Sequence, residues 1–440
     1  MFISIISFVF VIFIIILVHE FGHFIVAKMS GIKVKEFSIG FGPKLLSKKI
    51  GETEYIIRPI PIGGFVDLYG MEEAVVEKEK DWERSFVAKN AFIRFATLAA
   101  GYFMNYILAF FVLFSLYFFV GQIEPLMSDE PVVAIDIQES VAYKNNLRLG
   151  DKIVMVNNVK VKKFHDLKER MLNKKTDLKI KAERNGNLFD VFLPAKDYKS
   201  LDEIGILQGT APVIGEVNPG QPADKAGLKK GEKIVSINGK KIFVWEQFAT
   251  IVHGKAGEKI DLVLSRDGAT LKKTLVPKDL LNKNMGLIGV APMVIFGEKP
   301  GFVKSITFAG TMIVRLTGTM IDTIKGLFSG SISVKNLSGP VGIASVVGRK
   351  AQEGITWLFY WMAFISLNIG FLNILPFPAL DGGRLLFIVI EFFGKLFTGK
   401  KVKISTKIEE TIHYAGLIVL FALLLIITYR DILRLLGVGQ

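Results

Sequence analysis

Cysteine is absent from this 440-residue chain. Its absence excludes disulfide bonds and catalysis by a thiolate, although it does not decide the compartment in which the chain works. Charge is also missing from several long apolar stretches, while 50% of all residues are hydrophobic and the mean hydropathy is +0.42. These values are high for a soluble protein, so we expect part of the chain to lie in a membrane.

The net charge of +14 could indicate a nucleic-acid partner, but the sequence carries no signature of a nucleic-acid-binding fold. Lysines that flank membrane spans, together with a lysine-rich soluble part, account for the positive balance. We therefore expect the lipid bilayer, and no nucleic acid, among the partners of the chain.

Four apolar stretches are long enough to cross a bilayer. They are Phe2 to Val18, from which the helix is expected to run on to about Met29, then Ala91 to Val120, Ile355 to Leu375 and Thr411 to Thr428. Residues 28–94 carry twelve Lys or Arg, and residues 384–407 carry six. By the positive-inside rule both basic segments are cytoplasmic, which places residues 121–354 outside. The predicted fold class is a multi-pass α-helical membrane protein with about four spans.

The first span contains the motif His-Glu-x-x-His at residues 19–23. Residues four apart lie on one face of a helix, so His19 and His23 can bind one metal ion, with Glu20 in reach of a water activated by it. Ionisable groups within a membrane are costly and usually mark a functional site. The motif predicts the active site of a zinc hydrolase, close to the cytoplasmic face.

Catalytic zinc usually takes three protein ligands and keeps a fourth position for water. The other histidines of the chain are most simply surface or interfacial side chains: His165, His253 and His413. Asp381 is the better candidate for the third ligand, because the third span should bring it from outside to the level of His19. Prolines and paired glycines at 376–383 break the helix there and let the carboxylate turn inward.

The segment outside the membrane contains an internal repeat, in which residues 147–154 align with 228–235 at an offset of 81. Each copy predicts a β-rich module with one short helix, at Phe164 to Leu172 and at Val244 to Val252. The second copy, through Pro222 to Leu228 and the glycine turn that follows, resembles a PDZ domain of the kind found in bacterial proteases. The first copy is a degraded version, and a spacer that binds nothing is the alternative for both.

Two further segments carry a pattern. Residues 32–70 predict a β-hairpin beside the first two spans, either re-entrant and offering a sheet edge to a substrate, or an ordinary cytoplasmic hairpin. Residues 301–330 have helical periodicity but carry charges such as Arg315 and Asp322, which favour an amphipathic helix on the outer membrane surface over a fifth span.

The predicted domains follow from these segments. They are a first transmembrane helix (1–30), a re-entrant β-hairpin region (31–90), a second transmembrane helix (91–121), two tandem PDZ-like domains (122–210 and 211–297), an amphipathic helix with a linker (298–350), a third transmembrane region (351–397), and a basic loop with the fourth helix and a tail (398–440).

In combination, these motifs identify a family. His-Glu-x-x-His in the first span, tandem PDZ-like modules outside, and Asn373-x-x-Pro-x-Pro-x-Leu-Asp-Gly-Gly at the third span resemble the site-2 protease family of intramembrane metalloproteases, in its bacterial RseP group. The resemblance covers nearly the whole chain. It implies a zinc-dependent endopeptidase of regulated intramembrane proteolysis, in the bacterial inner membrane.

The resemblance also implies roles for single residues. His19, His23 and Asp381 would be the Zn²⁺ ligands and Glu20 the catalytic base, which takes a proton as water attacks the peptide carbonyl. Asn373 would help to hold or polarise the substrate backbone.

Asn105 would share that role, because Gly101-x-x-x-Asn105 resembles the family's second-span motif. The family often has Pro where this chain has Tyr102.

The implied substrates are single-span membrane proteins already trimmed on the outside, such as anti-sigma factors or remnant signal peptides. The PDZ-like domains would contact the trimmed ends. Two other functions are compatible with parts of the pattern. A PDZ membrane scaffold would not need Glu20 between two histidines, and a metal transporter would need a polar path that the second and fourth spans hardly offer beyond Asn105.

Overall fold

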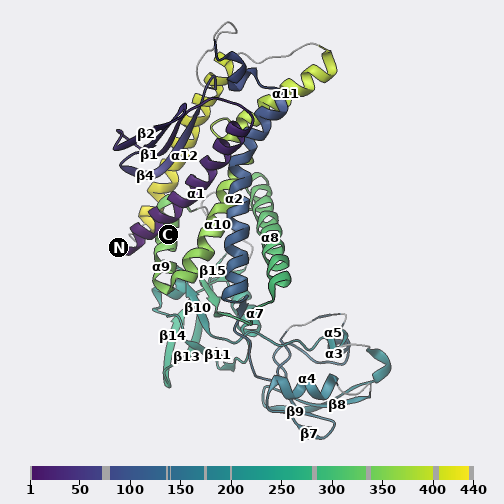
Figure 1. The fold of residues 1–440 in the computed structure, drawn as a ribbon. Coiled ribbons are helices and arrows are strands. Elements are labelled where there is room, and N and C mark those ends of the chain that lie inside the picture. Colours follow the sequence, from purple (N-terminus) through teal and green to yellow (C-terminus); the bar gives the residue numbers. More distant parts are fainter. Residues whose placement is uncertain are drawn as a thin grey trace. The chain divides into compact units, whose positions relative to one another are not determined.

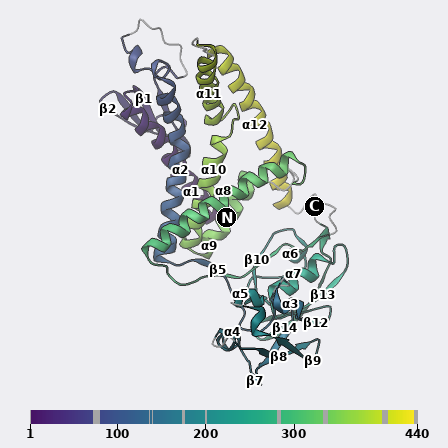
Figure 2. The same ribbon diagram turned by 90° about the vertical axis from the view of Figure 1, so that its right-hand side faces the viewer.

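The protein, seen here as a computed structural model, forms two compact units (Figures 1 and 2). Residues 1–122 with 298–436 make the first unit, and residues 123–297 make the second. The residues described are 2–71, 80–134, 137–138, 140–172, 176–198, 201–279, 285–332, 338–399 and 406–435. Part of the predicted basic loop, residues 400–405, lies outside these ranges.

Within the described ranges, four helices of the first unit are long and apolar enough to span a membrane. They are α1 (Phe2–Met29), α2 (Ala91–Phe119), α10 (Ile355–Ile374) and α12 (Thr406–Leu435). All four match the predicted stretches. Their ends have local causes: Asn90 caps α2 by accepting the N–H of Ile93 at 2.9 Å, and α10 ends two residues before Pro376.

Helices α1 and α2 cross at a glycine. A Cβ atom on Gly22 would lie 2.4 Å from the carbonyl oxygen of Ala100, so only glycine fits at this point of α1. Small residues at helix crossings let backbones approach closely, which is how membrane helices associate without a hydrophobic driving force. The crossing brings the His-Glu-x-x-His face of α1 against α2.

A four-stranded sheet follows α1. Its strands are β1 (Val34–Phe41), β2 (Leu46–Ile50), β3 (Thr53–Ile57) and β4 (Ile60–Leu68), in the order β2-β3-β1-β4. Strand β1 pairs antiparallel with β4 and parallel with β3. The segment is thus a sheet rather than the single hairpin expected. The missed strand β2 is exposed along its whole length and reads as Leu-Ser-Lys-Lys-Ile, without apolar alternation.

Charged side chains tie this sheet to the end of α1. Glu52, in the turn before β3, accepts hydrogen bonds from Arg84 at 2.6 and 2.7 Å and from Lys28, in the last turn of α1, at 3.1 Å. Desolvation alone would raise the pKa of Glu52, but these hydrogen bonds outweigh it and lower the pKa. Arg84 lies in η1 (Trp82–Arg84), which η2 (Phe86–Ala88) follows. The sheet is therefore fixed to the helix that carries the histidines.

Within the described part of the chain, the first unit also contains the helices α8 (Phe302–Phe328), α9 (Pro340–Glu353) and α11 (Asp381–Thr398). Helix α8 matches the predicted amphipathic helix, and it is not among the described helices that are long and apolar enough to span a membrane. Its buried residues Ala309 and Met320 pack with α2 and α10, and the Thr317 hydroxyl lies 3.3 Å from that of Tyr106. The apolar stripe of α8 therefore contacts protein along α2.

The second unit contains two modules with one strand order, β7-β6-β8-β9 in the first and β12-β11-β13-β14 in the second. The strands are β6 (Lys152–Val156), β7 (Val159–Lys160), β8 (Leu178–Arg184) and β9 (Asn187–Leu193), then β11 (Lys233–Ile237), β12 (Lys240–Lys241), β13 (Ile260–Arg266) and β14 (Ala269–Leu275). The predicted helices are α4 (Phe164–Leu172) and α7 (Trp245–His253).

Shorter elements surround these sheets. They are β5 (Ile123–Pro125), α3 (Val141–Lys144), η3 (Ala195–Asp197), α5 (Leu201–Ile204), β10 (Ile214–Val217), α6 (Pro222–Lys225), β15 (Lys278–Asp279), β16 (Gly286–Leu287), β17 (Val290–Pro292) and β18 (Val294–Phe296).

The repeat extends to a buried ion pair in each module. Asp151 is 1% exposed and accepts hydrogen bonds from Arg184 at 2.7 Å, while Glu232 is 0% exposed and pairs with Arg266 at the matching place. A carboxylate without exposure to water needs a cation and hydrogen bonds to remain charged. Both modules therefore use the same polar contact to close one end of the sheet.

We predict that Arg266→Leu destabilises the second module by about 3–5 kcal/mol, because it leaves the buried Glu232 carboxylate without its cation. The measurement is pulse proteolysis of the full-length protein, scored by cleavage within 211–297. Lys272→Leu is the matched control, since Lys272 is exposed on β14 of the same sheet. Equal stability of the two variants would contradict the prediction.

Candidate metal centre

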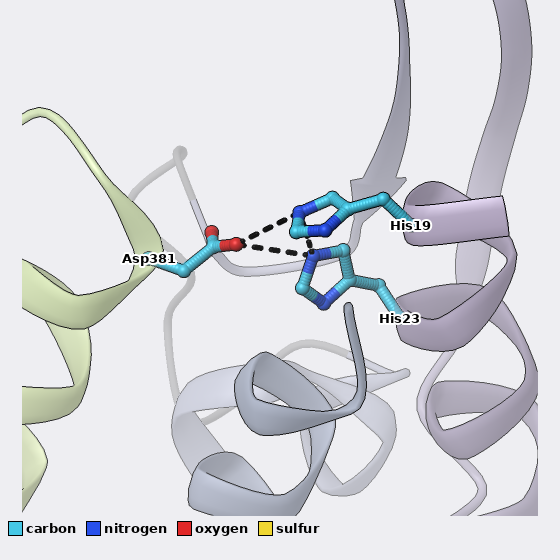
Figure 3. A group of neighbouring side chains, drawn as sticks. All are labelled: His19, His23 and Asp381. Carbon is cyan, nitrogen blue, oxygen red and sulfur yellow. Dashed lines mark hydrogen bonds and ion pairs between the residues drawn. The ribbon is translucent and has the colours of Figure 1, made fainter. Parts of the chain in front are cut away.

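Two histidines of α1 and one aspartate of α11 converge on a point (Figure 3). The His19 Nε2 and His23 Nε2 atoms are 3.2 Å apart, and both approach Asp381 Oδ2, at 3.1 and 3.3 Å. His19 and His23 are 7% and 8% exposed. The helical spacing predicted from the motif is thus observed, and the structure brings Asp381 to the two histidines across 362 residues of chain.

Helix α2 orients His23 and leaves room for both rings. The Nδ1–H of His23 donates a hydrogen bond to the Thr97 carbonyl at 2.8 Å, which turns Nε2 toward Asp381. A Cβ atom on Gly101 would lie 2.4 Å from His23 Nε2 and 2.7 Å from His19 Cε1. The missing side chain at Gly101 therefore leaves the space that the two imidazole rings occupy. No sequence pattern could reveal the Thr97 contact, because a backbone carbonyl accepts a hydrogen bond regardless of residue type.

Asp381 reaches the histidines because the chain breaks between α10 and α11. Residues 375–380 form the turn, and Asp381 begins the new helix. A Cβ atom on Gly382 would lie 2.0 Å from the Leu375 carbonyl oxygen, and one on Gly383 would lie 2.5 Å from that of Phe377. The paired glycines thus let the first turn of α11 pack onto the break, as the sequence predicted.

Helix α12 supports the same turn. The Nδ1–H of His413 donates to the Pro378 carbonyl at 2.8 Å, and a Cβ atom on Gly416 would lie 2.9 Å from the Ala379 nitrogen. His413 therefore holds the segment that carries Asp381, a role that sequence reasoning missed by treating it as an interfacial residue. His165 and His253 are exposed and lie in the second unit.

Glu20 lies beside the cluster, at a cavity of about 400 Å³. Its carboxylate faces the backbone N–H of Val66, and a Cβ atom on Gly64 would lie 3.7 Å from its Cγ. Both residues belong to β4, which lies at one edge of the sheet. The cavity is lined by the three converging residues, by Glu20, and by Lys35, Phe65, Val66, Asp67, Leu68, Met71, Leu98 and Arg384. An extended chain beside β4 would thus pass Glu20.

The two asparagines predicted for the site lie on opposite sides of His19. Asn373, partly exposed at the end of α10, places Nδ2 3.4 Å from His19 Nε2. Asn105, on α2, is 0% exposed and places Nδ2 3.3 Å from His19 Nδ1. Asn373 therefore faces the point where the ligand atoms meet, whereas Asn105 lies behind the ring.

The three donor atoms fit a zinc ion. Two imidazole nitrogens and one carboxylate oxygen are the ligand types that catalytic zinc takes, and at zinc–ligand distances of about 2.0–2.1 Å a tetrahedral site separates its donors by about 3.3 Å. The observed separations of 3.1 to 3.3 Å agree with this value. Three protein donors leave a fourth position for water or substrate.

Comparison with known proteins identifies the family. Residues 7–423 match the profile of peptidase family M50. The chain belongs to peptidase family M50. The expected resemblance to the site-2 protease type is thereby confirmed, and the protein is a multi-pass zinc-dependent membrane peptidase.

Curated relatives extend over the whole chain. Zinc metalloprotease RasP of Geobacillus kaustophilus is 31% identical over 98% of this chain and 97% of its own. Regulator of sigma-E protease RseP of Escherichia coli is 30% identical over 98% of both chains. A solved PDZ domain of an SdrC-like protein from Listeria monocytogenes matches 20% of this chain at 18% identity, with a TM-score of 0.17, too low to carry a fold argument.

We predict that Gly101→Ala weakens zinc binding, because the added methyl group would overlap the imidazoles and force α1 and α2 apart at a cost of about 1–3 kcal/mol. Zinc content after chelator competition measures the effect. Gly310→Ala is the control: Gly310 lies in α8 with nothing within 4 Å of the added atom. If Gly101→Ala binds zinc as tightly as the wild type, the two imidazole rings do not depend on the space at Gly101.

Proposed function

We propose that the protein hydrolyses a peptide bond in or near a transmembrane segment, with His19, His23 and Asp381 as zinc ligands and Glu20 as general base. The observation that carries this proposal is the convergence of three donor atoms within 3.3 Å of one another, with Glu20 next to them on the same cavity. Zinc, when bound, supplies Lewis-acid polarisation of water and of the scissile carbonyl.

The chain's own residues perform the remaining steps. Glu20 takes the proton of the attacking water and returns it to the leaving amine. The amide N–H of Asn373 points toward the ligand atoms, so it can donate to the substrate carbonyl as negative charge develops on the oxygen. Glu20 lines the cavity and Asn373 lies against His19, so both side chains are oriented before the substrate arrives, which reduces reorganisation during the reaction.

Strand β4 offers the substrate an extended partner. A transmembrane helix hides its carbonyls in hydrogen bonds, so it must unwind before hydrolysis. Strand β4 lies at one edge of the sheet and runs past Glu20 at Gly64 and Val66, and pairing with it would replace hydrogen bonds lost from the helix. We extend the proposal to a re-entrant position of this sheet, since its exposed residues include Phe41, Leu46 and Ile60.

The modules of the second unit complete the proposal. We assign both to the PDZ-like class on their shared strand order and on the motif around Pro222 to Leu228, and we propose that they contact the ends of substrates trimmed outside the membrane. They would lie outside the bacterial inner membrane, with the metal centre near its cytoplasmic face. One relative is named for the regulation of sigma-E, and membrane anti-sigma factors are the substrate class we propose, with remnant signal peptides second.

Glu20→Gln is expected to lower turnover of a single-span substrate in detergent by about 100- to 10,000-fold while zinc stays bound, because only the proton acceptor is lost. Asp381→Asn should weaken zinc binding, because a neutral amide replaces the charged ligand. Cleavage is read on gels of a tagged substrate, and zinc is counted on each protein by elemental analysis.

Glu36→Gln is the matched control for these variants. Glu36 lies on β1, in the same sheet as the cavity-lining strand β4, but it does not line the cavity itself. It should keep both zinc and activity. Cleavage that survives in Glu20→Gln would contradict the assigned base. Full zinc affinity in Asp381→Asn would contradict the assigned third ligand.

A substrate whose transmembrane segment carries Gly or Asn near the cut is predicted to be cleaved faster than an all-leucine segment. Each glycine lowers helix stability by about 1 kcal/mol relative to alanine, which favours the unwound form. The comparison uses two substrates of equal length and identical flanks, at concentrations well below KM. Equal kcat/KM for both would argue against unwinding before cleavage.

A further inference from the structure

The side chain of Asn105 has one polar atom without a partner. Asn105 is 0% exposed, and among the described residues its Oδ1 is a buried side-chain atom with no hydrogen bond. Its other amide atom, Nδ2, lies 3.3 Å from His19 Nδ1. An unpartnered acceptor of this kind is rare in a protein interior and calls for a physical reason.

Asn105 cannot reach a substrate from where it lies. It is absent from the cavity lining, its own carbonyl accepts the Ser366 hydroxyl at 2.8 Å, and a Cβ atom on Gly370 would lie 3.2 Å from its Cβ. The side chain is thus enclosed by α1, α2 and α10, behind the His19 ring. The substrate contact that the family resemblance implied for Asn105 does not suit this position.

The orientation of the His19 ring indicates which hydrogen bond the Asn105 side chain can make. Its Nε2 faces Asp381 and His23, as Figure 3 shows, so Nε2 is the atom available to a metal. A neutral imidazole carries one N–H, and binding through Nε2 leaves that hydrogen on Nδ1. The His19 Nδ1–H then needs an acceptor, just as the His23 Nδ1–H has one in the Thr97 carbonyl at 2.8 Å.

We propose that Asn105 is a positioning residue for the metal ligand His19, whose Nδ1–H is accepted by the Asn105 amide oxygen in the zinc-loaded protein. A half-turn of the amide about its terminal bond exchanges Oδ1 and Nδ2, which brings the oxygen to the place now 3.3 Å from Nδ1. The Asn105 Nδ2 atom now faces Nδ1 at 3.3 Å, a contact that suits only a ring whose hydrogen is on Nε2. Metal loading thus selects both the His19 tautomer and the Asn105 orientation.

The inference rests on the proposed ligand set, and it predicts how substitutions of Asn105 affect zinc rather than cleavage. Asn105→Leu has nearly the same volume without an acceptor and should weaken zinc binding about 10- to 100-fold. Asn105→Asp keeps an oxygen acceptor but has no amide N–H, and it should hold zinc at least as tightly as the wild type. Asn368→Leu, the same exchange on α10, is the control and should leave zinc binding unchanged.

The first measurement is zinc affinity by chelator competition on the detergent-solubilised full-length protein, followed by visible spectra of the cobalt-loaded form. Weaker binding and an altered cobalt spectrum in Asn105→Leu, with wild-type behaviour in Asn105→Asp, supports the proposal. Zinc loss in Asn105→Asp overturns it, as does wild-type affinity in Asn105→Leu. Should Asn105→Leu fail to fold, Asn105→Asp still decides between an accepting oxygen and a donating N–H.

His19→Ala, measured in parallel, separates this proposal from the ligand set. If His19→Ala keeps wild-type zinc affinity, His19 is not a ligand and the proposed centre itself is wrong. If His19→Ala loses zinc while Asn105→Leu keeps it, the centre stands and only the role of Asn105 falls.

Discussion

The close crossing of α1 and α2 is the constraint on which the centre depends. Gly22 on α1 lets the two backbones approach closely, and Gly101 on α2 leaves room between them for the His19 and His23 rings. Because of this close crossing, the His23 ring reaches the Thr97 carbonyl and the His19 ring reaches Asn105. Membrane helices pack through small residues at such points, and here the packing contact and the metal site are the same contact.

The two helices supply different parts of the chemistry. Helix α1 carries His19, Glu20 and His23, whereas α2 places the Thr97 carbonyl and the Asn105 amide against the two imidazole rings. The sheet after α1 adds a third layer, because Glu52 ties it to Lys28 and so keeps the β4 edge beside Glu20. Helix α2 thus orients the rings carried by α1, and the end of α1 in turn holds the sheet in place.

Much of this arrangement could be read from the sequence, and the reasons for success and failure are physical. His19, Glu20 and His23 were predictable because a short helical spacing determines their geometry, and Asp381 because hydrophobic length and a proline break determine its depth.

Strand β2 was missed, since a fully exposed strand has no apolar alternation. The contact of α8 with α2 was missed because charged residues such as Arg315 and Asp322 suggested a helix outside the span bundle. Thr97 and the orientation of Asn105 depend on tertiary contacts that no local pattern records.

The distance in sequence between the ligands has a consequence for how the protein is made. His19 and His23 enter the membrane with the first helix, but Asp381 follows 362 residues after His19, beyond the whole second unit. During translation the nascent chain therefore carries two histidines and no third donor until the ribosome has produced α11. With the proposed ligand set, the centre cannot assemble until both modules of the second unit have been synthesised.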